Sequence, residues 1–242
     1  MSGDIAEGVI QAINLVVTLN PAVMQIATLS LYISLMATII AALIAIPLGS
    51  LIHFHDFRGK RALIILIQTL YSVPTVVVGL VIYLLISRSG PLGFLGLLFT
   101  PSGMILGQTV LIIPIMMGLV ISALSGVDRS ISDTLVSLGA TPLQKIVEIV
   151  KEARFAIMSA VVLGFGRAIA EVGVAMMIGG NIRDQTRVLT TAITLETGMG
   201  NFAFSIALGI ILLIVALIVV VALNLITAGM SDDAQKIAGG PG

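Results

Sequence analysis

The sequence predicts an all-α polytopic membrane protein with about five transmembrane helices, an amphipathic helix before them, and a polar loop between the third and fourth spans. Of its 242 residues, 58% are hydrophobic and only 10% are charged, and the mean hydropathy is +1.17. A soluble domain is usually about a quarter charged, so this composition indicates an integral membrane protein. Five apolar segments are long enough to cross a bilayer core, which needs about 20 helical residues.

Composition also excludes several classes of function. Twelve basic and twelve acidic residues cancel, so no overall field recruits nucleic acid. The absence of cysteine excludes disulfides and thiolate chemistry. The chain has no phosphate-binding GxxxxGK[ST] motif and no HExxH motif, so we expect no enzyme activity, catalytic residue or cofactor. His53, His55 and Asp56 have metal-ligand side chains but no further convincing ligand nearby, so we expect no metal site.

Residues 1–22 are predicted to form an N-terminal interfacial helix. Apolar residues recur at helical spacing between Asp4 and Asn20, with polar residues between them. The alternative is a short sixth span. The first residues carry no basic segment, so we expect no cleavable signal peptide.

Residues 23–228 form the predicted transmembrane domain, and residues 229–242 are a polar C-terminal tail. Pro47, Pro74 and Pro114 fall within the first three spans, where each is expected to kink its helix. Such kinks suit a transporter whose helices diverge around a path. The five predicted spans are Val23–Ile52, Ala62–Ile86, Met104–Leu124, Phe155–Ile178 and Phe202–Ala228.

Lysine and arginine are unevenly distributed between the two sides of these spans. Eight lie in the segments on one side, three lie on the other, and Arg167 falls inside the fourth span. Because the basic side faces the cytoplasm, we expect the N-terminus outside, the C-terminus inside, and the loop 128–154 in the cytoplasm.

The first half of this loop is expected to be a short helix. Ser130 is a suitable N-cap, and Asp133 can return a hydrogen bond in a capping box. Gly139 can adopt the left-handed conformation that ends the helix. One face of the helix carries Ile131, Leu135 and Leu138.

A second helix is predicted to follow directly. Thr141 is its N-cap, Pro142 its first residue, and Gln144 closes a capping box. The two helices would present a small apolar ridge to a groove on a soluble partner. Alternatively, Leu135 and Leu138 pack back on the membrane domain.

This loop resembles the EAA loop of ATP-binding-cassette (ABC) importer permeases, whose pattern is Glu-Ala-Ala, three residues, Gly, nine residues, Ile-x-Leu-Pro. Aligned on Gly139, Asp133 stands for the Glu and Ile149 matches the Ile, whereas Lys151 and Glu152 replace Leu-Pro. The resemblance implies a coupling helix that docks on a cytoplasmic ATPase. It assigns the contacts to Ile131, Asp133, Leu135, Leu138, Gly139, Ala140 and Pro142.

Two polar features lie in and after the fourth span. Arg167 and Glu171 can pair at i, i+4 spacing, either as a structural lock or beside an anion path. The following loop could line an anion entrance, form a docking surface for a binding protein, or be a plain solvated loop. Its polar residues are Asn181, Arg183, Thr186 and Arg187.

Longer stretches carry a second, more specific resemblance. GFGRAIAEVGVAMMIGGNI (164–182), TRVLTTAI (186–193) and GPLGFLGLLFTP (90–101) resemble the tungstate branch of the molybdate, sulfate and tungstate importer permeases. This resemblance implies a type I ABC permease in the cell inner membrane that works as a homodimer. It also implies two cytoplasmic ATPase subunits and an extracytoplasmic oxyanion-binding protein.

An oxyanion path needs groups that donate hydrogen bonds without holding the anion by full charge. Hydroxyl and amide side chains in the second and third spans are our candidates: Gln68, Thr69, Ser72, Thr75, Gln108 and Thr109. Molybdate, sulfate and phosphate remain alternative cargoes. A self-contained channel or ion-coupled carrier, or an anchor that moves nothing, are the alternative classes.

Overall fold

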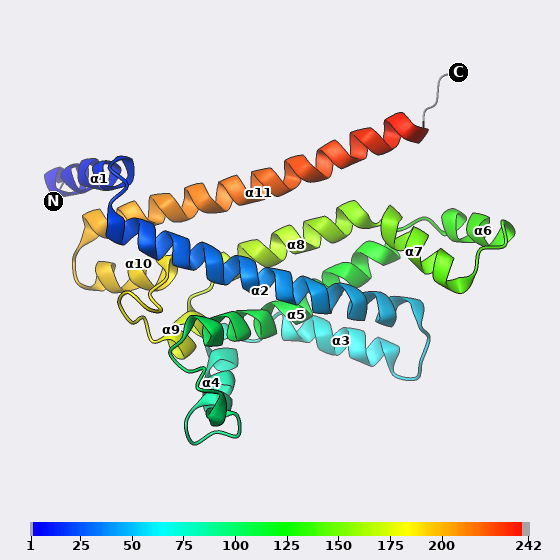
Figure 1. The fold of residues 1–242 in the computed structure, drawn as a ribbon, viewed down its shortest axis with the longest axis horizontal. Helices are drawn as coiled ribbons and strands as arrows, with labels where there is room; N and C mark the ends of the chain where they lie inside the picture. The colour runs from blue at the N-terminus through cyan, green and yellow to red at the C-terminus, as the bar shows by residue number, and fades with distance from the viewer. Residues whose placement is uncertain (1, 239–242) are drawn as a thin grey trace. The chain divides into compact units, whose positions relative to one another are not determined.

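The computed structural model describes residues 2–238, which form helices joined by turns and loops, with no strand among them (Figure 1). The predicted all-α class is confirmed. The helices are α1 (Ser2–Val17), α2 (Pro21–Phe54), α3 (Lys60–Leu70), α4 (Thr75–Ile86), α5 (Pro101–Ser125), α6 (Arg129–Ser137), α7 (Pro142–Glu152), α8 (Arg154–Ile169), α9 (Gly173–Gly179), α10 (Leu189–Gly198) and α11 (Phe202–Ala238), with a 3-10 turn, η1 (Gly93–Leu95), before α5.

The chain divides into two compact units, each built from segments that are distant in the sequence. The first comprises Met1–Ile39, Val73–Leu111 and Phe165–Val219. The second comprises Ile40–Ser72, Ile112–Gly164 and Val220–Gly242. Four of the five boundaries fall inside α2, α5, α8 and α11, so each unit contains part of these four helices, and the fifth lies between α3 and α4.

Three helices are long and apolar enough to cross a bilayer without interruption: α2, α5 and residues Phe202–Ala222 of α11. Two further spans are each divided between two helices. α3 meets α4 at 99°, and α8 meets α9 at 56°. The described residues therefore contain up to five spans when each bent pair counts as one, and the second and fourth predicted spans are broken rather than continuous.

The first break ends at a proline. Pro74 has no N–H and disfavours helical backbone at the residue before it. Its carbonyl accepts hydrogen bonds from the N–H groups of Val77 and Val78, so it precedes α4 rather than kinking a continuous helix as predicted. Pro47 and Pro114, by contrast, lie inside α2 and α5, which continue through them.

Close glycine contacts join α4 to α9 in the first unit. A Cβ at Gly79 would lie 3.0 Å from the Cβ of Met177 and 3.1 Å from the Cα of Val174. A Cβ at Gly173, where α9 begins, would lie 2.7 Å from Thr75 Oγ1 at the start of α4. The first residues of these two half-helices are therefore in direct contact, and a larger side chain at either glycine would separate them.

A second packed region of the first unit surrounds the start of α2. Ser30 Oγ accepts a hydrogen bond from the N–H of Leu189 at 2.7 Å, which fixes the start of α10 against α2. The buried apolar cluster here comprises Val23 and Ala27 of α2, Leu189 and Ala192 of α10, and Leu208 and Ile211 of α11.

The two ends of the chain are helical within the described residues. α1 covers most of the segment predicted as the interfacial helix, with Ala12 buried and Ile13 and Val17 exposed. Its position at a membrane surface stays a prediction. α11 continues to Ala238, past Ala228, where we placed the end of the membrane domain.

Candidate functional site

The segment between α5 and α8 folds as the two short helices that the sequence predicts. The second begins as expected: Thr141 Oγ1 accepts a hydrogen bond from the N–H of Gln144, and Gln144 Oε1 accepts one from the N–H of Thr141 at 2.8 Å. Gly139 has a φ of +75°, so it supplies the left-handed turn between the helices.

The cap of α6 differs from the prediction. Asp128, not Ser130, is the N-cap, and its carboxylate accepts a hydrogen bond from the N–H of Ser130 at 2.8 Å. Because α6 begins at Arg129, Ser130 already lies inside the helix. The hydrogen bond from the Ser130 backbone, followed by one from its side chain, lowers the pKa of Asp128 below its ordinary value of 3.8.

The apolar side chains of this segment do not all face solvent. Ile131 and Leu135 are half-buried, whereas Leu138 is 79% exposed. Leu143 of α7 is 71% exposed. We call the most exposed apolar residues of α6 and α7 the apolar ridge; they are Val136, Leu138, Leu143 and Val147.

The remaining predicted coupling residues lie around this ridge. Asp133, Gly139 and Pro142 are exposed, and Ala140 is half-buried. The sequence analysis missed Val136, Leu143 and Val147. The spacing of Leu143 and Val147, four residues apart on a helix that begins at Pro142, could have identified them.

The break between α8 and α9 is organised by Glu171. Arg167 Nη1 lies 3.0 Å from Glu171 Oε2, so the expected pair is formed. Glu171 lies beyond the end of α8, however, and not within a continuous helix as predicted. Its Oε1 accepts a hydrogen bond from the N–H of Val174 at 3.1 Å, and its carbonyl accepts one from Thr190 Oγ1 at 2.8 Å. The Glu171 side chain is 1% exposed and that of Arg167 is 39% exposed.

These contacts give Glu171 a structural role. It caps the first turn of α9 and is fixed to α10 by Thr190, while Arg167 balances its charge. A buried carboxylate is tolerated when it is paired and its oxygens accept hydrogen bonds, and both conditions hold here.

The six candidate path residues have different environments. In the first unit, Gln108 and Thr109 are buried and Thr75 is half-buried, and Thr109 Oγ1 donates to the carbonyl of Ala37 at 3.4 Å. Gln108 Oε1 is buried and has no hydrogen-bond partner among the described residues. In the second unit, Gln68, Thr69 and Ser72 are exposed, and Thr69 Oγ1 donates to its own helix at Ile65.

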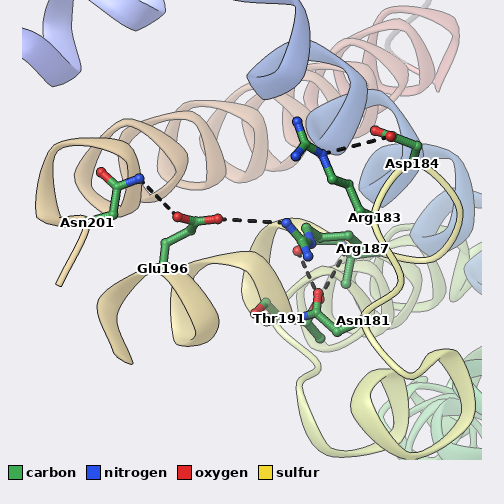
Figure 2. Close-up of polar contacts among 8 residues, drawn as sticks. Asn181, Arg183, Asp184, Arg187, Thr191, Glu196 and Asn201 are labelled. Atoms are coloured by element: carbon green, nitrogen blue, oxygen red, sulfur yellow. Dashed lines mark hydrogen bonds and ion pairs between the residues drawn. The ribbon is translucent and has the colours of Figure 1, made fainter. Parts of the chain in front are cut away.

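A cavity of about 290 Å³, which we call the loop cavity and whose wall is part polar and part apolar, lies among α2, α10, the start of α11 and the 180–188 loop. Arg187 Nη1 lies 3.7 Å from Glu196 Oε1 on its wall, and Asn201 Nδ2 donates to the other oxygen of Glu196 at 3.0 Å (Figure 2). Arg187 Nε is buried and makes no hydrogen bond with the residues described. The loop cavity therefore contains a guanidinium with unused donor capacity.

The other predicted residues of the 180–188 loop make different contacts. Thr186 is fully buried; its hydroxyl donates to the carbonyl of Gly179 and accepts from the N–H of Ile182. Asn181 Nδ2 donates to the carbonyl of Thr191 at 3.3 Å. Arg183 is exposed, and its Nε lies 3.9 Å from Asp184 Oδ2 (Figure 2). Sequence analysis missed Glu196 and Asn201, whose only signal was polarity at the end of an apolar helix.

Comparison with known proteins fits this architecture. Residues 45–232 match the family described as binding-protein-dependent transport system inner membrane component. The chain is 42% identical over 229 residues to the tungstate uptake system permease protein TupB of Peptoclostridium acidaminophilum, covering 95% of this chain and 99% of that protein. TupB of Campylobacter jejuni is 41% identical over 223 residues, which cover 92% of each chain.

A solved structure shows the same fold. It is that of a bacterial ABC transporter involved in the import of the acidic polysaccharide alginate, with a TM-score of 0.68 and 19% identity, covering 85% of this chain and 78% of that chain.

The family match and the similarity to two tungstate permeases place the protein in the class of multi-pass importer permeases. The chain belongs to the family of binding-protein-dependent transport system inner membrane components, so it is a transport permease and not an enzyme. The ABC permease resemblance of its sequence is thereby confirmed.

Proposed function

We propose that this chain is the membrane-spanning subunit of an ATP-driven importer that carries tungstate inward. One observation carries the proposal: the 42% identity to a tungstate uptake permease extends over 95% of this chain and 99% of that protein. The breaks, the loop cavity and the segment between α5 and α8 all lie inside the matched region, so the likeness includes the functional parts as well as the apolar spans.

Two copies of this chain would form the permease, with one ATPase subunit on each and an extracytoplasmic binding protein that delivers the anion. The apolar ridge supports an ATPase partner. Leu138 and Leu143 expose large apolar side chains on a segment that is preorganised by two caps, which suits a groove on a partner protein. With the ridge in the cytoplasm, the N-terminus is outside and the C-terminus inside.

The anion path follows from how charge is arranged in the first unit. Arg167 is balanced by Glu171, so it does not present a full positive charge that would trap a dianion. The side-chain amide N–H groups of Gln108 and the hydroxyl of the adjacent Thr109, which donates only a long 3.4 Å hydrogen bond to Ala37, can donate hydrogen bonds to an anion that passes. Gln68, Thr69, Ser72 and Thr75 are the further lining residues of the proposal.

The loop cavity is the proposed outer end of this path. Arg187 and Arg183 line it. An anionic group in the cavity could accept hydrogen bonds from the N–H groups of Arg187 that do not contact Glu196. Asn181 and Thr186 hold the loop in shape. The same loop would contact the binding protein during delivery.

Calorimetry of the cognate binding protein tests the cargo. We expect nanomolar tungstate affinity, with molybdate, sulfate and phosphate as the competing anions. Micromolar or weaker tungstate affinity beside nanomolar molybdate affinity would overturn the tungstate assignment.

Transport by the reconstituted complex tests the class. In proteoliposomes, tungstate uptake should require the binding protein, the ATPase subunit and ATP. Uptake that persists in vesicles with the permease alone would instead show a self-contained channel or carrier.

A further inference from the structure

We propose that the second unit contains a binding site for a phosphate-type anion where α2 and α5 end, separate from the cargo path. A cavity of about 370 Å³ lies there among the ends of α2 and α5 and the helices α6 and α7. The polar residues on its wall are His53, Ser125, Asp128, Arg129, Ser132 and Lys145.

Two of these residues, Arg129 and Lys145, carry a positive charge without an ion-pair partner in the part of the chain that the structure describes. Lys145 is half-buried, and an ammonium that is partly removed from water without a counter-ion is unfavourable. Arg58 and Arg61 also make no ion pair among the described residues, but they do not line this cavity, whereas Arg129 and Lys145 lie together on its wall.

The neighbouring groups can add hydrogen bonds to an anion. The hydroxyl of Ser132 and the ring of His53 lie on this wall, whereas the Ser125 hydroxyl already donates to the carbonyl of Ile121 at 2.7 Å. Asp128 is the acidic residue in the cavity lining, and its carboxylate accepts a hydrogen bond from the N–H of Ser130 but keeps its negative charge. With Arg129 and Lys145 against this one carboxylate, the wall still carries a net positive charge beside a hydroxyl and a ring donor, which is the chemistry that recognises phosphate.

Position in the fold indicates where such an anion comes from. Two apolar spans stop at this cavity, at Phe54 and Ser125, so in a membrane it would lie beyond the apolar core, on the side of the headgroups. Basic pockets at this level attract anionic lipid headgroups. The cavity lining contains no residue of the apolar ridge, so an anion and an ATPase can bind together. A free oxyanion from the cytoplasm has the same chemistry, and the experiment must distinguish these two sources.

Lipid titration of the purified full-length permease tests the site. Native mass spectrometry would count bound short-chain phosphatidylglycerol against phosphatidylcholine with the same acyl chains. The double variant Arg129→Gln/Lys145→Gln should lower phosphatidylglycerol affinity on the order of ten-fold, because each basic residue near a membrane surface contributes measurably to anion binding. Lys145→Arg, which keeps the charge, should bind as the wild type does.

A matched control removes the same charge outside the cavity. Arg58→Gln/Arg61→Gln changes two basic residues at the end of α2 and the start of α3 that do not line it, and it should leave affinity within about two-fold. A second arm uses inorganic phosphate and tungstate with permease in phosphatidylcholine nanodiscs. Binding there that depends on Arg129 and Lys145, without a phosphatidylglycerol preference, would support the site and identify a free anion as its ligand. Equal binding by wild type and the Arg129/Lys145 variant in both arms, or an equal loss in the control, would overturn the proposal.

Discussion

The carboxylate of Glu171 accepts a hydrogen bond from the N–H of Val174 at 3.1 Å, across the break between α8 and α9. The first turn of α9 has N–H groups without partners inside the helix, and a negative charge there is favourable. Glu171 thus serves two purposes at once: it ends one half-helix and stabilises the start of the next. Arg167, one turn earlier, makes this possible inside an apolar span.

Glu171→Gln should destabilise the permease. The amide oxygen can still accept from Val174, but Arg167 loses its counter-charge. Because Arg167 is partly exposed, we expect a loss of about 1–2 kcal/mol rather than the larger cost of a fully buried unpaired charge. Thermal unfolding in detergent measures the effect. The double variant Arg167→Gln/Glu171→Gln should recover part of the stability, because it removes both charges. A loss of stability in the double variant that exceeds the sum of the losses in the two single variants would refute this account.

Gly79→Ala should separate α4 from α9. The added Cβ would meet Met177 and Val174 at about 3 Å, and overpacking of this kind costs roughly 1–3 kcal/mol. Gly166→Ala is the matched control, since a Cβ there meets nothing within 4 Å and alanine favours helix by about 1 kcal/mol. The melting temperature should fall for the first variant and rise or stay level for the second. A fall of equal size in both would show that helix contact is not the cause.

Leu138→Asp should abolish association with the ATPase subunit without altering the stability of the permease, because Leu138 is exposed and its side chain buries little in the chain itself. Co-purification of the two subunits is the measurement. Ser137→Asp places the same charge at the neighbouring exposed position and should retain the complex. Leu135→Asp, at a half-buried position, should also lower the melting temperature. Full co-purification by Leu138→Asp would exclude the ridge as the contact.

The start of α6 should be sensitive to acid. Hydrogen bonds from Ser130 lower the pKa of Asp128 in the folded state. Its contribution is therefore fully present above the unfolded pKa of about 4 and is lost as the pH falls through the lower folded value. Hydrogen exchange at α6 should speed up across that range in the wild type. In Asp128→Asn, whose amide can cap without titrating, exchange corrected for its intrinsic pH dependence should stay constant.

Local chemistry determined which parts of the fold could be predicted from sequence. The Thr141 capping box and the left-handed turn at Gly139 depend on residues within a few positions, and both were predicted correctly. At α6 two local signals competed. Asp128 and Ser130 are both good caps, and the choice between them depends on where α5 ends.

Non-local contacts explain what sequence reasoning missed. Arg167 and Glu171 have the spacing of a continuous helix, yet α8 ends between them. Two contacts with distant residues hold this break: the carbonyl of Glu171 accepts a hydrogen bond from Thr190, and Gly173 lies against Thr75. Likewise, Glu196 could not be recognised as a site residue from the sequence, because it is the fold that brings α10 and the 180–188 loop around one cavity.

The contact between Gly173 and Thr75 also has a mechanical consequence. α4 is joined to α3, and α9 to α8, by a short non-helical segment, and α4 and α9 pack closely on each other at Gly79 and Gly173. We therefore expect them to pivot together as one rigid body, about the segments around Pro74 and Glu171. Two spans that are separate in the sequence would then change their tilt in concert, so that a displacement applied to one of them reaches the other without any change in their mutual packing.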